Sequence, residues 1–172
     1  MSLLNFRHHV FAGAFIAAAF ASPAHAEEPR IVSAGGSTTE IVYALDAESD
    51  LVGVDSTSLY PKAAREFPDV GYVRQLSAEG LLSLRPTLIL AGAEAGPEAA
   101  LTQTEAAGVR IVKLEEGYTP EEVAKHIEAI GAALGREEKA AEVAGIFRAD
   151  VKAVLAEVAQ IKTHPRVLFM LK

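Results

Sequence analysis

The sequence predicts an α/β fold, in which a doubly wound parallel sheet is followed by one long connecting helix. Between residues 30 and 135, short apolar runs alternate with stretches of helical pattern. Apolar runs bounded by Gly, Pro or polar turns are typical of buried parallel strands, and their alternation with helices indicates helices on both faces of the sheet. Residues 136–162 contain no Pro and a single Gly, which predicts one uninterrupted helix.

The predicted elements follow one another without an internal repeat. We expect strands at residues 31–33, 51–54, 88–91 and 110–114, and helices at residues 38–45, 61–67, 77–84, 97–107 and 119–134. The last of these helices has the clearest start, because Pro120 suits the first helical position and Glu122 can form a capping box with Thr119. Gly135 predicts where that helix ends.

The long helix carries an apolar stripe. Its members recur at alternating steps of four and three, at Ala140, Ala144, Phe147, Val151, Val154, Val158 and Ile161. At 1.5 Å per residue the helix would be about 40 Å long, more than a helix that covers a sheet needs. The length favours a strut between two lobes, and the alternatives are a helix folded back on its own domain or a weak dimer seam.

After this helix, residues 166–171 have the pattern of a further strand. A single strand needs a partner for its backbone hydrogen bonds. This strand therefore either joins the edge of the first sheet or begins a second lobe.

The first 26 residues have the pattern of a cleavable secretory signal peptide. Residues 1–9 include Arg7 and no acidic residue, residues 10–21 are almost wholly apolar, and residues 24–26 read Ala-His-Ala, a small-x-small cleavage motif. An apolar core of about a dozen residues is too short for a membrane span of about 20. We therefore expect an exported, periplasmic chain that begins at residue 27.

Composition excludes some classes of partner. The formal net charge is −7, and removal of residues 1–26, which hold Arg7 and no acidic residue, changes it to −8. An acidic protein has no general field that would attract nucleic acid or an anionic membrane. The chain contains no Cys, so the fold depends on packing rather than on disulfides.

The stretch at residues 53–61, Gly-Val-Asp-Ser-Thr-Ser-Leu-Tyr-Pro, places Tyr60 in the loop that follows a predicted strand. Pro61 disfavours the helical conformation at Tyr60. Ligands of open α/β sheets bind at the carboxyl ends of the strands, so Tyr60 is a candidate binding residue. Taken alone, the local sequence also suits a tyrosine ring that only packs against Pro61.

Further motifs follow Tyr60 in a fixed order. They are Gly-Tyr-Val-Arg-Gln-Leu at residues 71–76, Ser-Ala-Glu-Gly at 77–80 and Leu-Arg-Pro-Thr-Leu-Ile-Leu at 84–90. Together with the Tyr60 stretch, this series resembles the periplasmic haem-binding proteins of bacterial haem ABC importers. The similarity covers residues 27–172.

The resemblance implies a two-lobe architecture, in which two doubly wound lobes are joined by a long helix and the ligand lies in the cleft between them. Residues 27–135 would form the first lobe, residues 136–162 the inter-lobe helix, and residues 163–172 the start of a second lobe. The similarity ends inside the first strand of that second lobe. On this basis we expect a truncated gene product or a fragment.

The resemblance also implies a function. The chain would carry out no chemistry of its own, but would capture ferric haem delivered through an outer-membrane haem receptor and pass it to an ABC permease and its ATPase. Tyr60 matches the axial ligand of the haem carriers, and a phenolate is a recognised ligand of ferric haem. No residue can be assigned as the second axial ligand. His126 is expected on a helix surface, and a turn explains His164.

Three more residues are candidate contacts for the haem propionates. Arg74 offers a planar fork of donors that matches a carboxylate, although a surface arginine paired with an acid fits equally well. Gly36 and Ser37 lie between the first strand and the first helix, where backbone amides can bind an anion. A tight turn with Ser37 or Thr38 as the helix N-cap explains this segment equally well.

Glu79 lies in the first turn of a helix that Ser77 is expected to cap. A glutamate there interacts favourably with the helix dipole. The resemblance adds a second role, since a matching glutamate on the outer surface of each lobe engages arginines of the permease in related importers.

The sequence contains no motif that supports an enzyme. We find no Gly-x-Ser-x-Gly elbow, no His-Glu-x-x-His and no metal-site spacing of His, Asp and Glu. The nearer alternative is a cobalamin- or ferric-siderophore-binding protein of the same fold, because those relatives share part of the motif series.

Overall fold

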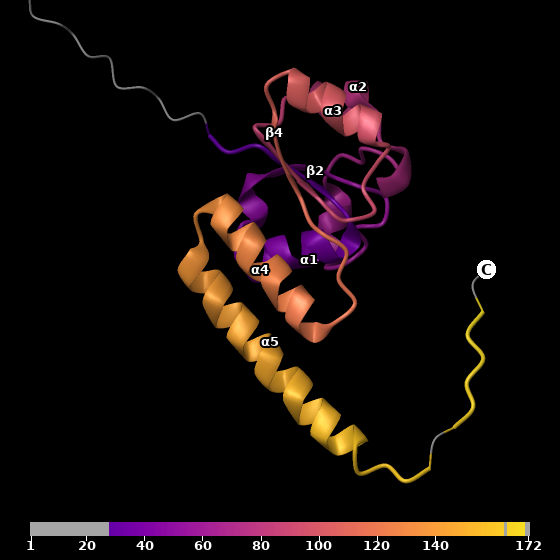
Figure 1. Ribbon diagram of the computed structural model, residues 1–172. Helices are drawn as coiled ribbons and strands as arrows, with labels where there is room; N and C mark the ends of the chain where they lie inside the picture. Colours follow the sequence, from indigo (N-terminus) through magenta and orange to yellow (C-terminus); the bar gives the residue numbers. More distant parts are fainter. Residues whose placement is uncertain (1–27, 164, 171–172) are drawn as a thin grey trace, which may run out of the picture.

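A four-stranded parallel sheet forms the centre of the molecule in the computed structural model, which describes residues 28–163 and 165–170 (Figure 1). The strands are β1 (Ile31–Ala34), β2 (Leu51–Val54), β3 (Leu88–Ala91) and β4 (Arg110–Lys113), in the order β2-β1-β3-β4. All four predicted strands are confirmed to within one residue at an end. The predicted signal peptide, residues 1–26, lies outside the described residues, as does His164.

Helices cover both faces of this sheet. They are α1 (Gly36–Ala44), α2 (Ala78–Ser83), α3 (Glu98–Ala106), α4 (Pro120–Leu134) and α5 (Glu137–Val158). Helices α1 and α4 lie on one face with α5 outside α4, whereas α2 and α3 lie on the other face (Figure 1). The predicted doubly wound α/β class is confirmed.

Alternate residues of the central strands enter two separate cores. Ile31, Leu88 and Leu90 pack with α1 and α4, whereas Val32 and Ile89 pack with α2 and α3. Because both faces are covered, every residue of β1 and β3 is buried. This explains why these strands read as continuous apolar runs rather than as alternating ones.

Local signals at the ends of helices are mostly confirmed. Thr119 and Glu122 form the capping box of α4, and Gly135 ends that helix in the left-handed conformation. The expected helix at residues 61–67 is instead a short 3-10 helix, Lys62–Glu66. Five residues are too few to complete a stable α-helical segment, and i→i+3 bonds are common in such short connections.

Helix α5 packs along α4 only over its first half. Arg148 donates to Glu121 at 2.7 Å and to Glu128 at 3.0 Å, so it links the two helices. The hydrogen bond from Arg148 lowers the pKa of Glu121 below its usual value. Beyond this point α5 extends past the edge of the lobe (Figure 1), and Val154, Leu155 and Val158 are exposed.

In the C-terminal part of the chain the end of the long helix differs from the expectation, whereas the start of a second lobe at residues 163–172 stays a prediction. The long helix ends at Val158 rather than at residue 162, and at 22 residues it is about 33 Å long. Residues 165–170 form no strand and do not join the sheet. A strand is stabilised by the hydrogen bonds of a neighbour, and this segment has none among the described residues.

No helix within the described ranges is long and apolar enough to cross a membrane.

The contact between α4 and α5 depends on a glycine. A Cβ atom at Gly131 would overlap the Cβ of Ala140 and lie 3.2 Å from the carbonyl oxygen of Arg136. Gly145 on α5 has open space around its Cα instead. An added methyl group would therefore clash at Gly131 but not at Gly145.

We predict opposite effects of Gly→Ala at these two positions. Gly131→Ala should lower the free energy of unfolding by about 1 kcal/mol or more, because overpacking costs about 1–3 kcal/mol and exceeds the gain in helix propensity. Gly145→Ala should raise it by up to about 1 kcal/mol. Urea unfolding of both variants provides the test. An increase for Gly131→Ala would show that α5 does not pack closely on α4.

Candidate ligand-binding site

The loop that leaves the carboxyl end of β2 presents Tyr60 to solvent. Tyr60 is 68% exposed, and its neighbour Leu59 is also exposed. Within the described residues the Tyr60 hydroxyl makes no hydrogen bond, although the loop around it is rich in polar contacts. The local alternative, in which the ring only packs against Pro61, stays open. An exposed phenol at a strand end is free to bind a ligand.

A second loop lies beside the Tyr60 loop and carries Arg74. The Ser56 amide donates to the carbonyl oxygen of Gly71 at 3.0 Å, and Asp69 forms a bridge with Val54 of β2. Arg74 follows in a 3-10 turn, is exposed and forms no ion pair in the part of the chain that the structure describes. Tyr60 and Arg74 thus come from two loops that are hydrogen-bonded to each other through Ser56 and Gly71.

The turn between β1 and α1 closes this edge of the sheet. Helix α1 begins at Gly36, and its N-cap is Gly35 with φ of 130° rather than Ser37 or Thr38, so the predicted side-chain cap is wrong. Glycine adopts this backbone conformation without the strain that a Cβ atom causes. Gly36 is half-buried and Ser37 exposed in the first turn. A Cβ on Gly36 would lie 3.0 Å from the carbonyl oxygen of Thr57, so this turn touches the Tyr60 loop.

The sequence analysis did not single out Asp55, whose side chain joins the turn before α1 to the Tyr60 loop. Its carboxylate is 1% exposed, and it accepts from the Gly35 amide at 2.8 Å, the Thr57 amide at 2.8 Å and the Ser58 hydroxyl at 2.7 Å. The Thr57 hydroxyl also donates to it. An Asp side chain that accepts from the backbone two residues later is a known turn arrangement, but the bond to Gly35 depends on the tertiary fold. A buried amide left without its acceptor costs about 1–3 kcal/mol.

Tyr118 is a second exposed phenol, in the loop between β4 and α4. Its ring is 86% exposed, but its hydroxyl donates to Glu116 Oε2 at 2.7 Å. This hydrogen bond, together with the negative charges of Glu116 and Glu122, raises the pKa of Tyr118 above its usual value. A carboxylate beside a phenol opposes formation of the phenolate. Tyr118 is therefore poorly suited to bind a metal ion through its oxygen.

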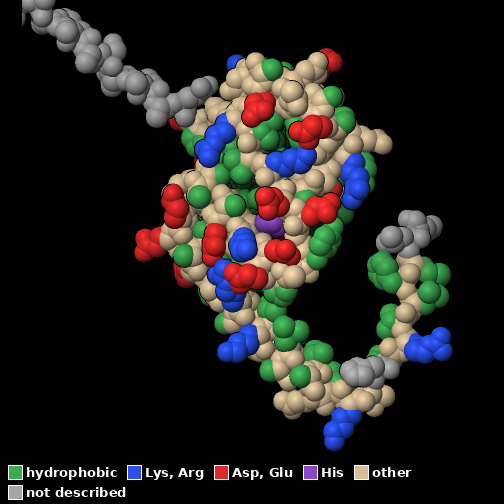
Figure 2. All heavy atoms as spheres, in the orientation of Figure 1, with side chains coloured by type: hydrophobic (Ala, Val, Ile, Leu, Met, Phe, Trp, Pro, Cys, Tyr) green, Lys and Arg blue, Asp and Glu red, His purple; other side chains and the backbone are tan. Residues whose placement is uncertain are grey.

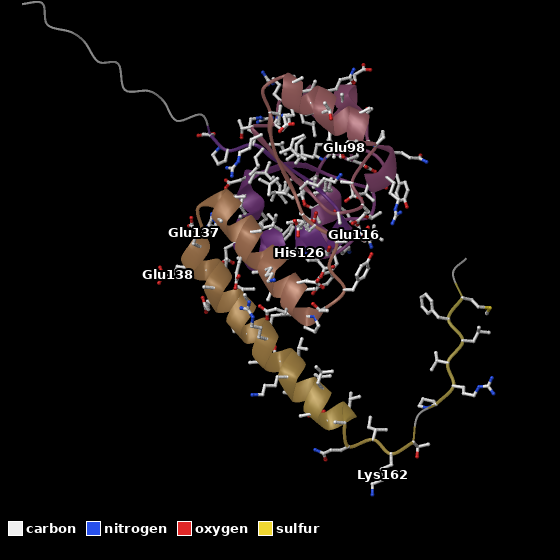
Figure 3. All side chains as sticks on the ribbon, viewed as in Figure 1. Glu98, Glu116, His126, Glu137, Glu138 and Lys162 are labelled. Carbon is white, nitrogen blue, oxygen red and sulfur yellow. The ribbon has the colours of Figure 1, made fainter. Side chains whose placement is uncertain are left out.

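His126 is more buried than the surface residue that we expected. It is half-buried on α4, and its ring lies against the loop at Gly117, where a Cβ atom would be 3.0 Å from His126 Cε1. Figure 3 shows Glu116 in the same loop, and Figure 2 shows acidic side chains around the histidine on this face. An anionic ligand is disfavoured among these acids. Packing against Gly117 is sufficient to explain His126.

Glu79 lies on α2, outside the Tyr60 and Arg74 loops. It is exposed in the first turn of α2, and Ser77 caps this helix through the Gly80 amide at 3.0 Å, as predicted. Helix α2 packs with α3 on the face of the sheet opposite α1 and α4. Across residues 28–163 and 165–170, moreover, no three His, Asp or Glu side chains lie close enough together to hold a metal ion.

Known structures share this architecture. The chain superposes on the periplasmic heme-binding protein BhuT in complex with two hemes with a TM-score of 0.72 and 41% identity, over 76% of this chain and 50% of that one. For the periplasmic heme-binding protein RhuT from Roseiflexus sp. RS-1, in apo form, the TM-score is 0.78 and the identity 36%, over 80% and 53% of the two chains. The matched region corresponds to about half of each structure.

Curated sequences give a wider range of relatives. An uncharacterized ABC transporter substrate-binding lipoprotein, YvrC from Bacillus subtilis (strain 168), is 34% identical over 73% of this chain and 40% of its own length. A vitamin B12-binding protein from Yersinia pestis (strain Pestoides F) is 30% identical over 86% of this chain and 51% of its own length. The chain thus spans about half the length of these relatives.

A family comparison covers nearly all of the described fold. Residues 31–172 match the family described as periplasmic binding protein. This range begins with β1 and includes all the strands of the sheet, the Tyr60 loop and α5. The chain belongs to the periplasmic binding protein family.

Proposed function

We propose that the chain is a haem-capturing component of an ABC importer, which binds ferric haem in the periplasm and passes it to a permease. Haem is favoured over other cargo because two heme-binding proteins match it at 36–41% identity. The members of the family are binding proteins for transport rather than enzymes, which agrees with the absence of a catalytic motif. An ABC permease, its ATPase and an outer-membrane haem receptor are the partners that this role requires.

The exposed phenol of Tyr60 carries the proposal. Ferric iron is a hard Lewis acid, and tyrosinate is one of its established haem ligands. A free phenol has a pKa near 10, so the iron must displace the proton on binding. The Tyr60 hydroxyl has no competing hydrogen bond in the described part of the chain, whereas that of Tyr118 is held by Glu116. Tyr60 is thus the better placed of the two to ligate iron.

Arg74, Gly36 and Ser37 are our proposed contacts for the propionates. The Arg74 loop is bonded to the Tyr60 loop through Ser56 and Gly71, so a cation and the phenol can contact one ligand. Gly36 and Ser37 are the first two residues of α1, whose amides lack an acceptor within the helix. The Gly35 amide is not available in the same way, because Asp55 occupies it.

We further propose that the exposed end of α5 contacts a second lobe. Val154, Leu155 and Val158 continue the apolar face that packs on α4, but they are exposed. Figure 1 shows this part of the helix standing free of the sheet. Burial of these side chains against another lobe would remove apolar surface from water.

A cobalamin-binding role is the second candidate. The vitamin B12-binding protein from Yersinia pestis is 30% identical to the chain, and a vitamin B12 binding protein, BtuF of Vibrio cholerae, superposes with a TM-score of 0.67 at 30% identity. Both candidates share the fold, so only the ligand separates them. Haem requires an iron ligand and therefore Tyr60, whereas cobalamin does not.

Titration with hemin tests the proposed function. The purified chain should give a saturable shift of the haem Soret band at one equivalent, and Tyr60→Phe should weaken binding by at least about tenfold, because a ligand bond to iron is lost. Tyr118→Phe is the matched control and should bind hemin as the unchanged chain does. Equal binding by all three proteins would contradict ligation by Tyr60. A saturable response to cyanocobalamin but not to hemin would favour the second candidate.

We propose that Glu79 docks the permease, since it is exposed in the first turn of α2. Glu79→Lys should abolish haem-dependent growth of cells that rely on this protein, while the hemin titration stays unchanged. Glu142→Lys reverses an exposed charge on α5 and should affect neither measurement. Normal growth of the Glu79→Lys strain would exclude the docking role.

A further inference from the structure

The buried carboxylate of Asp55 holds the Tyr60 loop against the rest of the lobe. It follows β2 directly, and it binds across to the Gly35 amide while also binding Thr57 and Ser58 in its own loop. We infer that Asp55 is a positioning residue for Tyr60, which fixes the loop so that the phenol meets the ligand in one orientation. This inference rests on the proposed function of Tyr60 as the ligand-binding residue.

The other hydrogen bonds of the Tyr60 loop are local or exposed, and they include one from Arg65 Nε to the Leu59 carbonyl oxygen at 3.1 Å. The loop backbone makes the bonds Ser58 N–H to Asp55 O at 3.0 Å and Leu59 N–H to Thr57 O at 2.9 Å, which lie inside the loop itself. The Ser56 amide reaches Gly71 at 3.0 Å. The Asp55 side chain thus links this loop to the Gly35 amide at the start of α1, and Ser58 makes a second contact with α1 through Thr39. An exposed phenol on an unattached loop would sample many positions and pay more entropy on binding.

The contact extends into a chain of buried hydroxyl groups. Ser58 Oγ lies 2.8 Å from Thr39 Oγ1, and Thr39 Oγ1 lies 2.8 Å from Ser33 Oγ. Ser33 belongs to β1 and Thr39 to α1, and all three side chains are buried. Through Ser58, the Asp55 carboxylate is therefore coupled to the centre of the sheet. These contacts attach the loop to the buried part of the fold.

The two oxygens of Asp55 face different backbone donors. Oδ1 accepts from the Gly35 amide and Oδ2 from the Thr57 amide, both at 2.8 Å. Hydroxyl groups can rotate to donate or accept, but a backbone N–H cannot. In Asp55→Asn, either orientation of the new amide directs its NH₂ group at one of these two N–H groups. The substitution keeps the shape of the side chain and must break one of the two attachments.

Asp69→Asn is the matched control. Asp69 lines the same cavity of about 170 Å³ beneath the Tyr60 loop as Asp55, and it accepts from the Gly71 amide at 2.7 Å. Asp69 is exposed, so an asparagine there can keep this bond and direct its NH₂ group to water. Both variants remove one negative charge near Tyr60. Only Asp55→Asn disturbs the attachment of the loop.

The first measurement is hemin affinity, with the tyrosinate-to-iron charge-transfer absorption as the signature of ligation. Asp55→Asn should bind hemin at least about tenfold more weakly and show a reduced charge-transfer band, because one backbone donor is left unpaired. Asp69→Asn should match the unchanged chain in both. If Asp55→Asn keeps the affinity and the charge-transfer band, Asp55 does not position Tyr60.

The second measurement needs no ligand and remains decisive if the chain does not bind haem. Amide hydrogen exchange of the Asp55→Asn chain should be at least about tenfold faster at Gly35 or Thr57, with β3 amides unchanged. A general loss of stability would instead accelerate exchange in β3 as well, and unchanged exchange at both amides would overturn the inference. If Asp55→Asn does not fold, Thr57→Val removes one hydroxyl donor to Asp55 and should shift the same amides less.

Discussion

The buried carboxylate of Asp55 makes the interactions on which the proposed ligand-binding edge depends. Parallel strands end at one edge of a sheet, and the loops that follow them have no regular hydrogen-bond partners of their own. Here a single side chain supplies acceptors to the turn before α1 and to the Tyr60 loop. The cost of burying a carboxylate is offset by four donors that converge on it. The edge is ordered by polar contacts, while the two apolar cores order the sheet behind it.

As a result, the side chains that we propose for ligand binding take no part in stabilising the fold. Tyr60 is exposed and its hydroxyl makes no hydrogen bond in the part of the chain that is described, and Arg74 on the adjacent loop forms no ion pair there. Tyr118 shows the contrast, because its hydroxyl is bound by Glu116 and its pKa is raised. A protein that binds a molecule with an iron centre and carboxylates needs an unoccupied side chain that can bind the iron as an anion. It also needs an unoccupied cationic side chain for the carboxylates. The proposed function explains why both Tyr60 and Arg74 are exposed.

Much of the fold could be predicted from the sequence, because its signals are local. Buried parallel strands read as short apolar runs, and Thr119 with Gly135 marked the ends of α4. The end of α5 could not be predicted from its apolar stripe, since the stripe continues to Ile161 while the helix ends at Val158. The position of Tyr60 followed from the strand before it, but the bond from Gly35 to Asp55 joins residues 20 apart in the chain. Contacts of that kind appear only once the strands are side by side.

The most direct test of this account is a crystal structure of the chain soaked with hemin. We expect the iron within bonding distance of Tyr60 Oη, a propionate at Arg74 or at the first turn of α1, and an unchanged set of hydrogen bonds at Asp55. Haem bound instead along the exposed apolar face of α5, with Tyr60 free in solvent, would contradict the account, because adsorption on apolar surface would then explain any Soret shift.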